Sequence, residues 1–402
     1  MDLRYTDDYE AFRAEVKSFL DANWPLKGEE AKLGLEQAAA LFRQRAIEAG
    51  YLARAIPKAY GGSEQDPDVL KATIITEELT RASAPREAMG LGPNLLVPTL
   101  LDHGSQWQKE KFIGPTMRGE IRWCQGYSEP GSGSDLASLQ TRAELNGDEW
   151  VINGQKIWTS GAQVADYMFC LCRTEPDVPK HAGISYVLID MKQPGIEVRP
   201  LKQMTGDSHF NEVFFSDAKT PADWIVGERG QGWIVSRSTL KHERNMIGNA
   251  SRTEGLFRSV VGLAKRSKIG GKPAIEDPAI RRRLAELEGY VMAHKYSGYR
   301  LLTHSARGQD AGIMQSMNKL FTTNFGHEIA KLSLDLIGDG GLVGPSSRAG
   351  MAEAASSTGG WVNQYMGSLG SAIAGGTANI QRNIIAERGL GLPRDRAAET
   401  SK

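Results

Sequence analysis

The sequence has few of the features that mark a secreted, membrane-spanning or nucleic-acid-binding protein. Three cysteines in 402 residues are too few for a disulfide framework and favour a reducing compartment. Basic and acidic residues both number 48, so no excess positive charge is available for nucleic acid. No apolar run approaches the ~20 residues that cross a bilayer, and the polar N-terminus does not resemble a signal peptide. We therefore expect a cytoplasmic protein without membrane insertion and without a nucleic-acid partner.

Candidate metal ligands are also scarce. Cys170 and Cys172 lie two positions apart in an apolar run, so their side chains would share one face of a strand. No further cluster of cysteine or histidine stands near them to complete a tetrahedral set of ligands. We therefore expect no metal site.

The period of the apolar residues divides the chain into three parts. Residues 1–120 and 231–402 repeat with a helical period, whereas residues 121–230 alternate as strands do and carry frequent turn residues. Strands do not alternate with helices, which disfavours a Rossmann domain. We expect an α+β multidomain fold with an N-terminal α-helical domain (1–120), a middle antiparallel β-barrel or sandwich domain (121–230) and a C-terminal four-helix bundle (231–402).

Turn residues and long helical runs predict individual elements within these parts. Asn146-Gly147 and Asn153-Gly154 each stand between short runs rich in Trp, Val and Ile, and Asn-Gly is typical of two-residue hairpin turns. Several helical runs of the last part are long, which favours helices that pack along much of their length. These helices are expected at residues 233–265, 278–306, 311–337 and 367–388.

A loop rich in small residues follows the first expected strand. Residues 123–135 read Trp-Cys-Gln-Gly-Tyr-Ser-Glu-Pro-Gly-Ser-Gly-Ser-Asp. Glycine lets a ligand approach the backbone, and successive N–H groups in such a loop form a concavity that favours an anion such as a pyrophosphate. An ordinary surface turn is the alternative, because clusters of Gly, Ser and Pro are common in turns.

Two further motifs follow this loop. Residues 153–160 read Asn-Gly-Gln-Lys-Ile-Trp-Thr-Ser, and residues 373–382 read Ile-Ala-Gly-Gly-Thr-Ala-Asn-Ile-Gln-Arg. In this order and at these separations, the three segments resemble the acyl-CoA dehydrogenase family, from about residue 9 to residue 394. The resemblance implies the family's three-domain fold, a non-covalent FAD, an acyl-CoA substrate oxidised to its trans-2-enoyl form, electron-transfer flavoprotein as a partner, and a homotetramer built as a dimer of dimers.

The resemblance assigns flavin contacts to all three motifs. The mid-chain loop would border the flavin, Ser134 would lie toward the pantetheine arm of the substrate, and Trp158 would lie against the ring system. A plain core tryptophan is the alternative for Trp158, and capping or turn chemistry is the alternative for Thr377 and Asn379. The implied FAD-binding residues are Gln125, Tyr127, Ser128, Gly133, Ser134, Trp158, Thr159, Ser160, Arg266, Thr377 and Asn379.

The catalytic base is where the chain departs from the best-known branch of the family. That branch has a glutamate at the position of Gly375, and glycine has no side chain to accept a proton. A second branch, which includes isovaleryl- and long-chain acyl-CoA dehydrogenases, places its base just before an arginine in an early helix of the C-terminal domain. The resemblance therefore implies Glu243 as the base, while a solvated ion pair is the alternative. Ser134, Arg244 and the backbone of Gly375 are the expected substrate contacts.

Two further departures leave other functions open. Ile269 replaces the Phe of the family's Arg-x-x-Phe-Gly run, which starts here at Arg266, and Asp335 starts the run that matches the family's Gln-x-x-Gly-Gly loop. An aspartate would repel a diphosphate. A non-catalytic or half-site subunit of a heterotetrameric acyl-CoA dehydrogenase is therefore one alternative, and an acyl-CoA oxidase is another. Ala374 and Gly375 leave space that predicts branched or bulky acyl chains.

Overall fold

Two compact units make up the chain in the computed structural model. The structure describes residues 5–87, 90–345 and 357–393, without the side chains of residues 244–246 and 305–306. The glycine-rich part of the mid-chain loop belongs to the second unit rather than the first. The first unit contains Met1–Glu129, Leu139–Glu197 and Val213–Thr239, and the second contains Pro130–Ser138, Val198–Glu212 and Leu240–Lys402.

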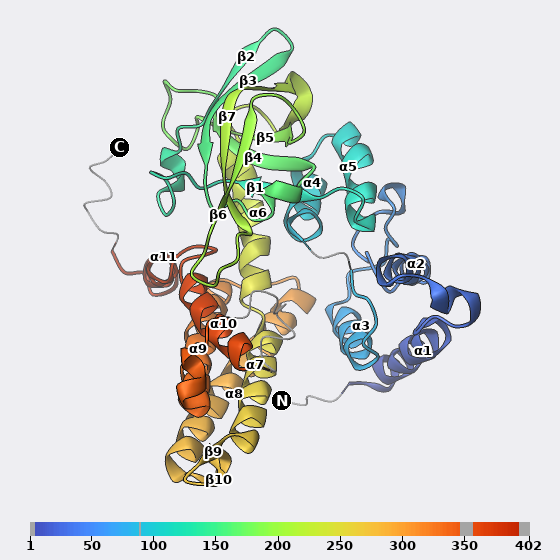
Figure 1. The fold of residues 1–402 in the computed structure, drawn as a ribbon. Helices are drawn as coiled ribbons and strands as arrows, with labels where there is room; N and C mark the ends of the chain where they lie inside the picture. Colours follow the sequence, from blue (N-terminus) through green and yellow to red (C-terminus); the bar gives the residue numbers. More distant parts are fainter. Residues whose placement is uncertain (1–4, 88–89, 346–356, 394–402) are drawn as a thin grey trace. The chain divides into compact units, whose positions relative to one another are not determined.

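The N-terminal part of the first unit is helical, as its apolar period predicts (Figure 1). Its elements are α1 (Asp7–Asn23), α2 (Leu35–Glu48), α3 (Val69–Arg81), α4 (Val97–His103) and α5 (Gln106–Arg118). Leu20 of α1, Phe42 of α2 and Leu79 of α3 meet in one buried apolar cluster. Burial of a side chain of this size contributes about 1.5–3 kcal/mol, so the cluster holds the three helices together.

Helix α5 fastens these helices to the sheet of the same unit. A capping box of Ser105 and Gln108 begins the helix. The Gln108 amide also donates hydrogen bonds to the carbonyl oxygens of Asp223, at 3.1 Å, and Ile225, at 2.8 Å. The Phe112 ring packs edge-on against Trp123, with ring centroids 5.2 Å apart. The helix therefore supports the strand from which the mid-chain loop starts.

The middle part is a mainly antiparallel eight-stranded sheet. Its strand order is β6-β7-β3-β2-β4-β5-β8, and β1 pairs with β4 in parallel. Strand β4 is buried at five consecutive positions, which explains its continuous apolar sequence. The strands are β1 (Trp123–Gly126), β2 (Arg142–Asn146), β3 (Glu149–Lys156), β4 (Tyr167–Arg173), β5 (Ile184–Asp190), β6 (Ile196–Leu201), β7 (Phe210–Pro221) and β8 (Ile225–Val226).

The two Asn-Gly pairs have different roles in this sheet. Gly147 has a φ of +63° in the turn between β2 and β3, so the hairpin expected there is confirmed. The hairpin expected at Asn153-Gly154 is wrong, because both residues lie inside β3. The register against β7 shifts between Ile152 and Gly154. A Cβ at Gly154 would stand 2.6 Å from the Cα of Thr141, so glycine permits a β-bulge with close backbone approach.

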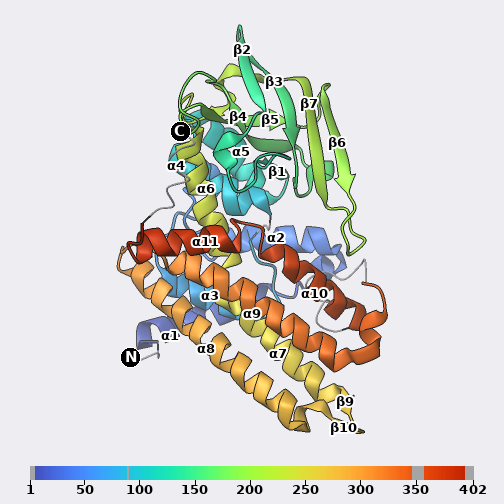
Figure 2. The same ribbon diagram turned by 90° about the vertical axis from the view of Figure 1, so that its left-hand side faces the viewer.

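Most of the second unit is a helical bundle (Figure 2). The expected helix 233–265 is wrong as one element, because it is interrupted at residues 248–249, where Asn249 caps the second half. The expected helix 367–388 is also wrong as one element, since Gly375 and Gly376 have φ values of +63° and +84°. The bundle elements are α6 (Gly232–Ile247), α7 (Ala250–Arg266), β9 (Lys268–Ile269), β10 (Lys272–Pro273), α8 (Pro278–Ala306), α9 (Met314–Ile337), α10 (Thr358–Ser371) and α11 (Ala378–Ile384).

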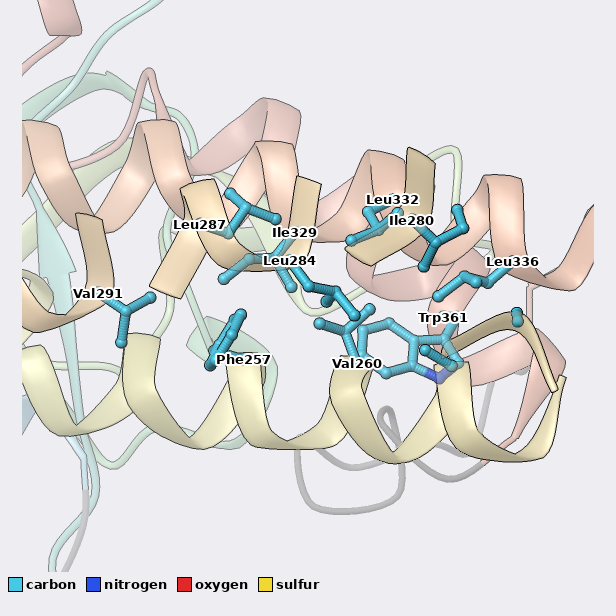
Figure 3. Close-up of a cluster of buried hydrophobic side chains, with 12 residues drawn as sticks. Phe257, Val260, Ile280, Leu284, Leu287, Val291, Ile329, Leu332, Leu336 and Trp361 are labelled. Atoms are coloured by element: carbon cyan, nitrogen blue, oxygen red, sulfur yellow. The ribbon is translucent and has the colours of Figure 1, made fainter. Parts of the chain in front are cut away.

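One apolar core joins four helices of this bundle. Figure 3 shows Phe257 and Val260 of α7 directed toward Leu284 of α8 and Ile329 of α9, with Trp361 of α10 against them. The Trp361 side chain is only 1% exposed. Because α7, α8 and α9 pack against one another along this core, they form a firm frame for the turns at one end of the bundle. Across the described residues, no helix has both the length and the apolar character needed to traverse a bilayer.

Candidate functional site

The mid-chain loop starts from a tightly packed strand in the first unit. A Cβ at Gly126 would stand 2.4 Å from the Sδ of Met168, so glycine is needed where β1 lies against β4. Gln125, one residue earlier, is partly buried and pairs with Phe169 of β4. Tyr127 is buried, with its ring perpendicular to that of Tyr186 at a centroid distance of 6.3 Å. The loop therefore leaves the sheet from a fixed position.

A buried ion pair joins the first two sequence motifs. The Lys156 side chain is fully buried at the end of β3, and its Nζ lies 2.8 Å from Oε1 of Glu129. The same ammonium group donates to the Tyr127 carbonyl oxygen at 3.2 Å. The backbone N–H of Ile157 donates to the carbonyl oxygen of Ser128 at 2.9 Å. These contacts fix two segments, residues 127–129 and residues 156–157, against each other.

The Glu129 carboxylate is well satisfied. Its oxygens accept hydrogen bonds from the backbone N–H groups of Gln140 at 2.6 Å and Thr141 at 2.8 Å, in addition to the Lys156 bond. Burial alone would raise the pKa of Glu129, but the Lys156 charge and these hydrogen bonds outweigh burial and hold the pKa below its ordinary value of 4.5. Glu129 is therefore a structural anion rather than a proton carrier at neutral pH.

Trp158 follows this ion pair in a strained and exposed position. Its φ is +60°, a left-handed conformation that is rare for a bulky residue, and its side chain is 59% exposed. Thr159 is buried and Ser160 is partly buried. The plain core tryptophan that sequence reasoning left open is excluded by this exposure. Strain of about 1–3 kcal/mol in an exposed aromatic residue points to a functional position.

The glycine-rich part of the loop, in the second unit, offers open space. A Cβ at Gly131 or Gly133 would meet no atom within 4 Å. The loop is shaped from inside by Ser132, whose hydroxyl donates to the carbonyl oxygens of Asp135 at 2.9 Å and Leu136 at 3.2 Å. Gly133 and Ser134 are exposed. Open backbone here fits a ligand that carries a diphosphate, such as the FAD that the resemblance implies.

The second unit brings Glu243 of α6 together with Gly375. A Cβ at Gly375 would stand 3.5 Å from Oε1 of Glu243 and 2.4 Å from Cδ1 of Ile247. Gly375 lies in the turn between α10 and α11 with a φ of +63°, a conformation that L side chains rarely adopt. Glu243 is partly buried. Its carboxylate thus occupies the space beside the position where the other branch carries its glutamate.

Other expected site residues have local roles that the structure makes visible. The Thr377 side chain caps α11 by accepting from the N–H of Ile380, and Asn379 accepts from Arg382 at 3.1 Å. Arg266 is exposed in the last turn of α7. The side chain of Arg244 lies outside the described residues. Asp335 forms an exposed ion pair with Arg283, at 2.6 Å.

The described residues contain no cluster of three His, Cys, Asp or Glu side chains arranged to hold a metal ion. Cys170 and Cys172 are buried with their sulfur atoms 3.7 Å apart, which is a contact between free thiols. Burial raises the pKa of the neighbouring Cys124 thiol well above its ordinary value. These cysteines therefore belong to the core of the sheet.

Family models match the chain in the order that the three motifs predict. The acyl-CoA dehydrogenase N-terminal domain matches residues 6–120, the middle domain matches residues 124–218, and the C-terminal domain matches residues 230–390. The chain belongs to the acyl-CoA dehydrogenase family. This finding confirms the expected family and its arrangement of helical, β-sheet and helical domains.

Several acyl-CoA dehydrogenases are similar over nearly the whole chain. Acyl-CoA dehydrogenase IpdE1 of Mycobacterium tuberculosis is 39% identical over 401 residues, which cover 96% of this chain and 99% of IpdE1. The solved ChsE4-ChsE5 complex of Mycobacterium tuberculosis is 29% identical with a TM-score of 0.75, covering 98% of this chain and 100% of that chain. The Tcur3481-Tcur3483 steroid ACAD is 28% identical with a TM-score of 0.77, at coverages of 98% and 100%.

Sequence reasoning missed the ion pair that supports the motifs of this acyl-CoA dehydrogenase. A signal for it was present, because Trp150, Ile152 and Lys156 fall on alternate positions of one run, and the first two are large and apolar. A lysine on the buried face of a strand requires an anion. The motif glutamate, Glu129, was the available partner. The exposed Gly154, between Ile152 and Lys156, interrupts the row of buried side chains and made this alternation hard to see.

Proposed function

We propose that this acyl-CoA dehydrogenase performs FAD-dependent α,β-dehydrogenation of an acyl-CoA thioester to the trans-2-enoyl-CoA. Glu243 takes the proton from the α-carbon, and the β C–H bond breaks with its electron pair leaving as hydride, so that a double bond forms between the two carbons. FAD, when bound, would supply the acceptor for this hydride at N5, and electron-transfer flavoprotein would take up the electrons. The residues of this chain bind the substrate, orient it and hold the proton.

The proximity of Glu243 to Gly375 carries this proposal. The two positions at which members of the family place a base are adjacent here, and only Glu243 has a carboxylate, which lies 3.5 Å from where a Cβ at Gly375 would be. Its partial burial would favour proton transfer, because desolvation makes a carboxylate a stronger base. The N–H of Gly375 is proposed to donate to the thioester oxygen, with Ser134 and Arg244 as further substrate contacts.

The proposed flavin contacts are the residues that the resemblance implies, some exposed and others, such as Tyr127 and Thr159, buried. The exposed Trp158 ring would flank the isoalloxazine, and Gln125, Tyr127, Ser128, Thr159 and Ser160 would line its edge. The loop at Gly133 and Ser134 would supply backbone N–H groups. Arg266, Thr377 and Asn379 are proposed for the ADP half of the cofactor. Capping by Thr377 is compatible with this role, because a capped helix start leaves further N–H groups for a phosphate.

A bulky acyl group is the proposed substrate class. Gly375 and Ala374 leave room where a glutamate and a tyrosine would otherwise project. A solved relative of similar fold is a steroid ACAD, and a polycyclic acyl-CoA has the volume to fill such a space. We expect faster flavin reduction by cholanoyl-CoA than by octanoyl-CoA. A clear preference for octanoyl-CoA would count against the bulky class.

The test of the reaction is anaerobic flavin reduction by a panel of acyl-CoA thioesters, followed as loss of the visible flavin band. Glu243→Gln should bind FAD as the wild type does and reduce it about 10²–10⁴-fold more slowly, the usual contribution of a positioned base. Glu328→Gln is the matched control, because Glu328 forms an exposed ion pair with Lys331 on α9. Normal reduction by Glu243→Gln would remove this residue from the mechanism.

A half-site subunit of a heteromer is the second candidate function. A similar solved structure is the ChsE4-ChsE5 complex, and Asp335 is held by Arg283 at the loop that in other members reaches a neighbouring flavin. The test is the flavin content of the chain purified alone and with a co-expressed second subunit. A homotetramer with one FAD in each chain would exclude this candidate, whereas a colourless protein that gains FAD with its partner would favour it. Rapid reoxidation by air would instead indicate an oxidase.

A further inference from the structure

The bundle contains a buried ammonium group that the proposed reaction does not use. Lys319 of α9 is fully buried, and its Nζ has no hydrogen-bond partner in the described part of the chain. An unpaired ammonium group is among the most costly groups to bury, unless an anion lies close by. Among the described residues of the second unit, Lys319 is the one buried lysine or arginine. Its position therefore requires an explanation.

Lys319 and Glu243 each lie one helical turn from a residue that lines the same cavity. Ile247 of α6 and Thr323 of α9 line the same cavity of about 50 Å³. Residues four apart on a helix lie on one face. One turn back from Ile247 on α6 is Glu243, and one turn back from Thr323 on α9 is Lys319. Helix α7 follows α6 in the chain, and α8 returns the chain between α7 and α9, so α7 and α9 pack side by side in the same direction (Figure 2). Lys319 and Glu243 are close enough for the carboxylate charge to act on the ammonium group.

Of the described side chains, His294 and Arg252 lie near this point, and neither supplies a competing buried charge. His294 of α8 is buried, and its Nε2 lies 3.2 Å from the carbonyl oxygen of Gly248, just after α6. Burial lowers the pKa of His294, although the hydrogen bond to Gly248 opposes this effect, so the ring is neutral at pH 7. Arg252 of α7 lines the cavity but is exposed, so water screens its charge.

We propose that Lys319 is a positioning residue for the catalytic base: its buried ammonium group keeps Glu243 ionised and directed toward Gly375, ready to accept the α-proton. The proposal rests on the role of Glu243 given above. It also explains why a lysine is retained in an apolar environment, since the cation offsets the burial of the carboxylate that faces it. In the resting enzyme, Lys319 is protonated and Glu243 is ionised.

The electrostatics agree with the geometry. Burial lowers the pKa of Lys319, and the Glu243 carboxylate acts in the opposite direction and raises it. By reciprocity, the Lys319 cation must favour the ionised form of Glu243. If the cation is removed, partial burial would favour the protonated carboxyl group, which cannot act as a base at neutral pH. Glu243 would then work only at higher pH.

The kinetic test compares Lys319→Met, Lys319→Arg and the wild type, each loaded with FAD. Flavin reduction is measured from pH 6 to pH 9 with the acyl-CoA thioester that reduces the wild type fastest. Lys319→Met should reduce flavin about tenfold more slowly at pH 7 and regain most of the rate by pH 9, because one pKa unit is a factor of ten in the ionised fraction. Lys319→Arg should keep the wild-type profile, since it keeps the charge. An unchanged profile in Lys319→Met would overturn the proposal.

Lys331→Met is the matched control for this comparison. Lys331 lies on the same helix and forms an exposed ion pair with Glu328, so its removal should leave the pH profile as it is. A structural role for Lys319 would lower the rate equally at all pH values without moving the profile. Failure of the proposed function looks different: Glu243→Gln would then reduce flavin normally, or no thioester would reduce the wild type.

A thermal unfolding cycle tests the pair without any substrate. Glu243→Gln leaves the Lys319 ammonium group buried without its anion, so its melting temperature should fall below that of the wild type. Adding Lys319→Met to Glu243→Gln removes the stranded cation and should raise the melting temperature by more than Lys319→Met raises that of the wild type. If the two single changes in melting temperature simply add, the residues are not coupled and the proposal fails, whatever the kinetics show.

Discussion

The two lysines that are buried among the described residues occupy opposite kinds of environment. Lys156, in the first unit, is paired at 2.8 Å with Glu129 and donates a second bond to the backbone. Lys319, in the second unit, has no hydrogen-bond partner among the described residues. Lys156 holds two loops in place. Lys319 is a buried ammonium group without hydrogen bonds, close to the carboxylate that we propose as the base.

This contrast separates structural charge from functional charge. A buried pair with all of its bonds made resists change, because removal of either partner leaves a charge in a medium of low polarity. A buried cation without hydrogen bonds lowers the stability of the folded protein. Destabilising groups of this kind are found mainly at functional sites. We therefore expect the two lysines to respond in opposite ways to the same substitution.

The largest expected effect is that of Lys156→Met. The Glu129 carboxylate would remain buried with two backbone hydrogen bonds and no cation, so the free energy of unfolding should fall by about 3–5 kcal/mol. Chemical denaturation with fluorescence detection measures this loss. Lys219→Met is the control, because Lys219 forms an exposed ion pair with Glu149 on the same sheet, and it should cost under about 1 kcal/mol. A loss of that size for Lys156→Met would mean that the loops are held by other contacts.

The sequence predicted which parts of the chain are helical or form strands better than it predicted where helices break. Period and turn residues were enough to find the helices and strands, because each surface of these elements has one environment. The breaks at residues 248–249 and 372–377 were missed, since Asn249 and Gly375 interrupt runs whose apolar period continues on both sides. The motifs pointed to Trp158 and Glu243, but Lys319 carries no motif. Its burial depends on helices far apart in sequence, which no local pattern encodes.

Gly375→Ala, which changes the surroundings of Glu243 without changing any charge, should lower the free energy of unfolding by less than Lys156→Met does. Gly375→Ala must hold a φ of +63° and places its Cβ 2.4 Å from Ile247. The left-handed conformation costs about 1–2 kcal/mol, so the free energy of unfolding should fall by that amount. Flavin reduction should slow further than this loss alone explains, because the new methyl group overlaps Ile247, one turn from Glu243 on α6, and would displace the site around the carboxylate. Gly147→Ala, with the same φ of +63° in open space at the β2–β3 turn, is the comparison variant, and equal rates in the two variants would show that Gly375 does not border the reacting atoms.

Acid should weaken the first lysine pair selectively. The pKa of Glu129 is held below 4.5, so the native state binds fewer protons than the unfolded state in this range. The stabilisation is fully present above the unfolded pKa and is lost as the pH falls through the lower folded pKa. Between about pH 5 and pH 3, the wild type should therefore lose more stability than Lys156→Met/Glu129→Gln, in which no charge remains. Parallel curves of unfolding free energy against pH would contradict the ion pair.

The smallest expected effect is that of Lys319→Met on stability, and its sign is the informative part. The folded pKa of Lys319 lies below the ordinary value of 10.5, so the unfolded state binds more protons between the two values. The cost of the buried cation is therefore fully present below the folded pKa and disappears as the pH rises toward 10.5. Replacement by methionine, which is close in length, should raise the free energy of unfolding by about 1 kcal/mol at pH 7, with a gain that shrinks at alkaline pH. Denaturation at pH 7 and pH 9.5 measures the difference.

A loss of several kcal/mol for Lys319→Met, as expected for Lys156→Met, would contradict this prediction. Lys319 would then stabilise the fold in the same way as Lys156, and the distinction between the two lysines would be lost.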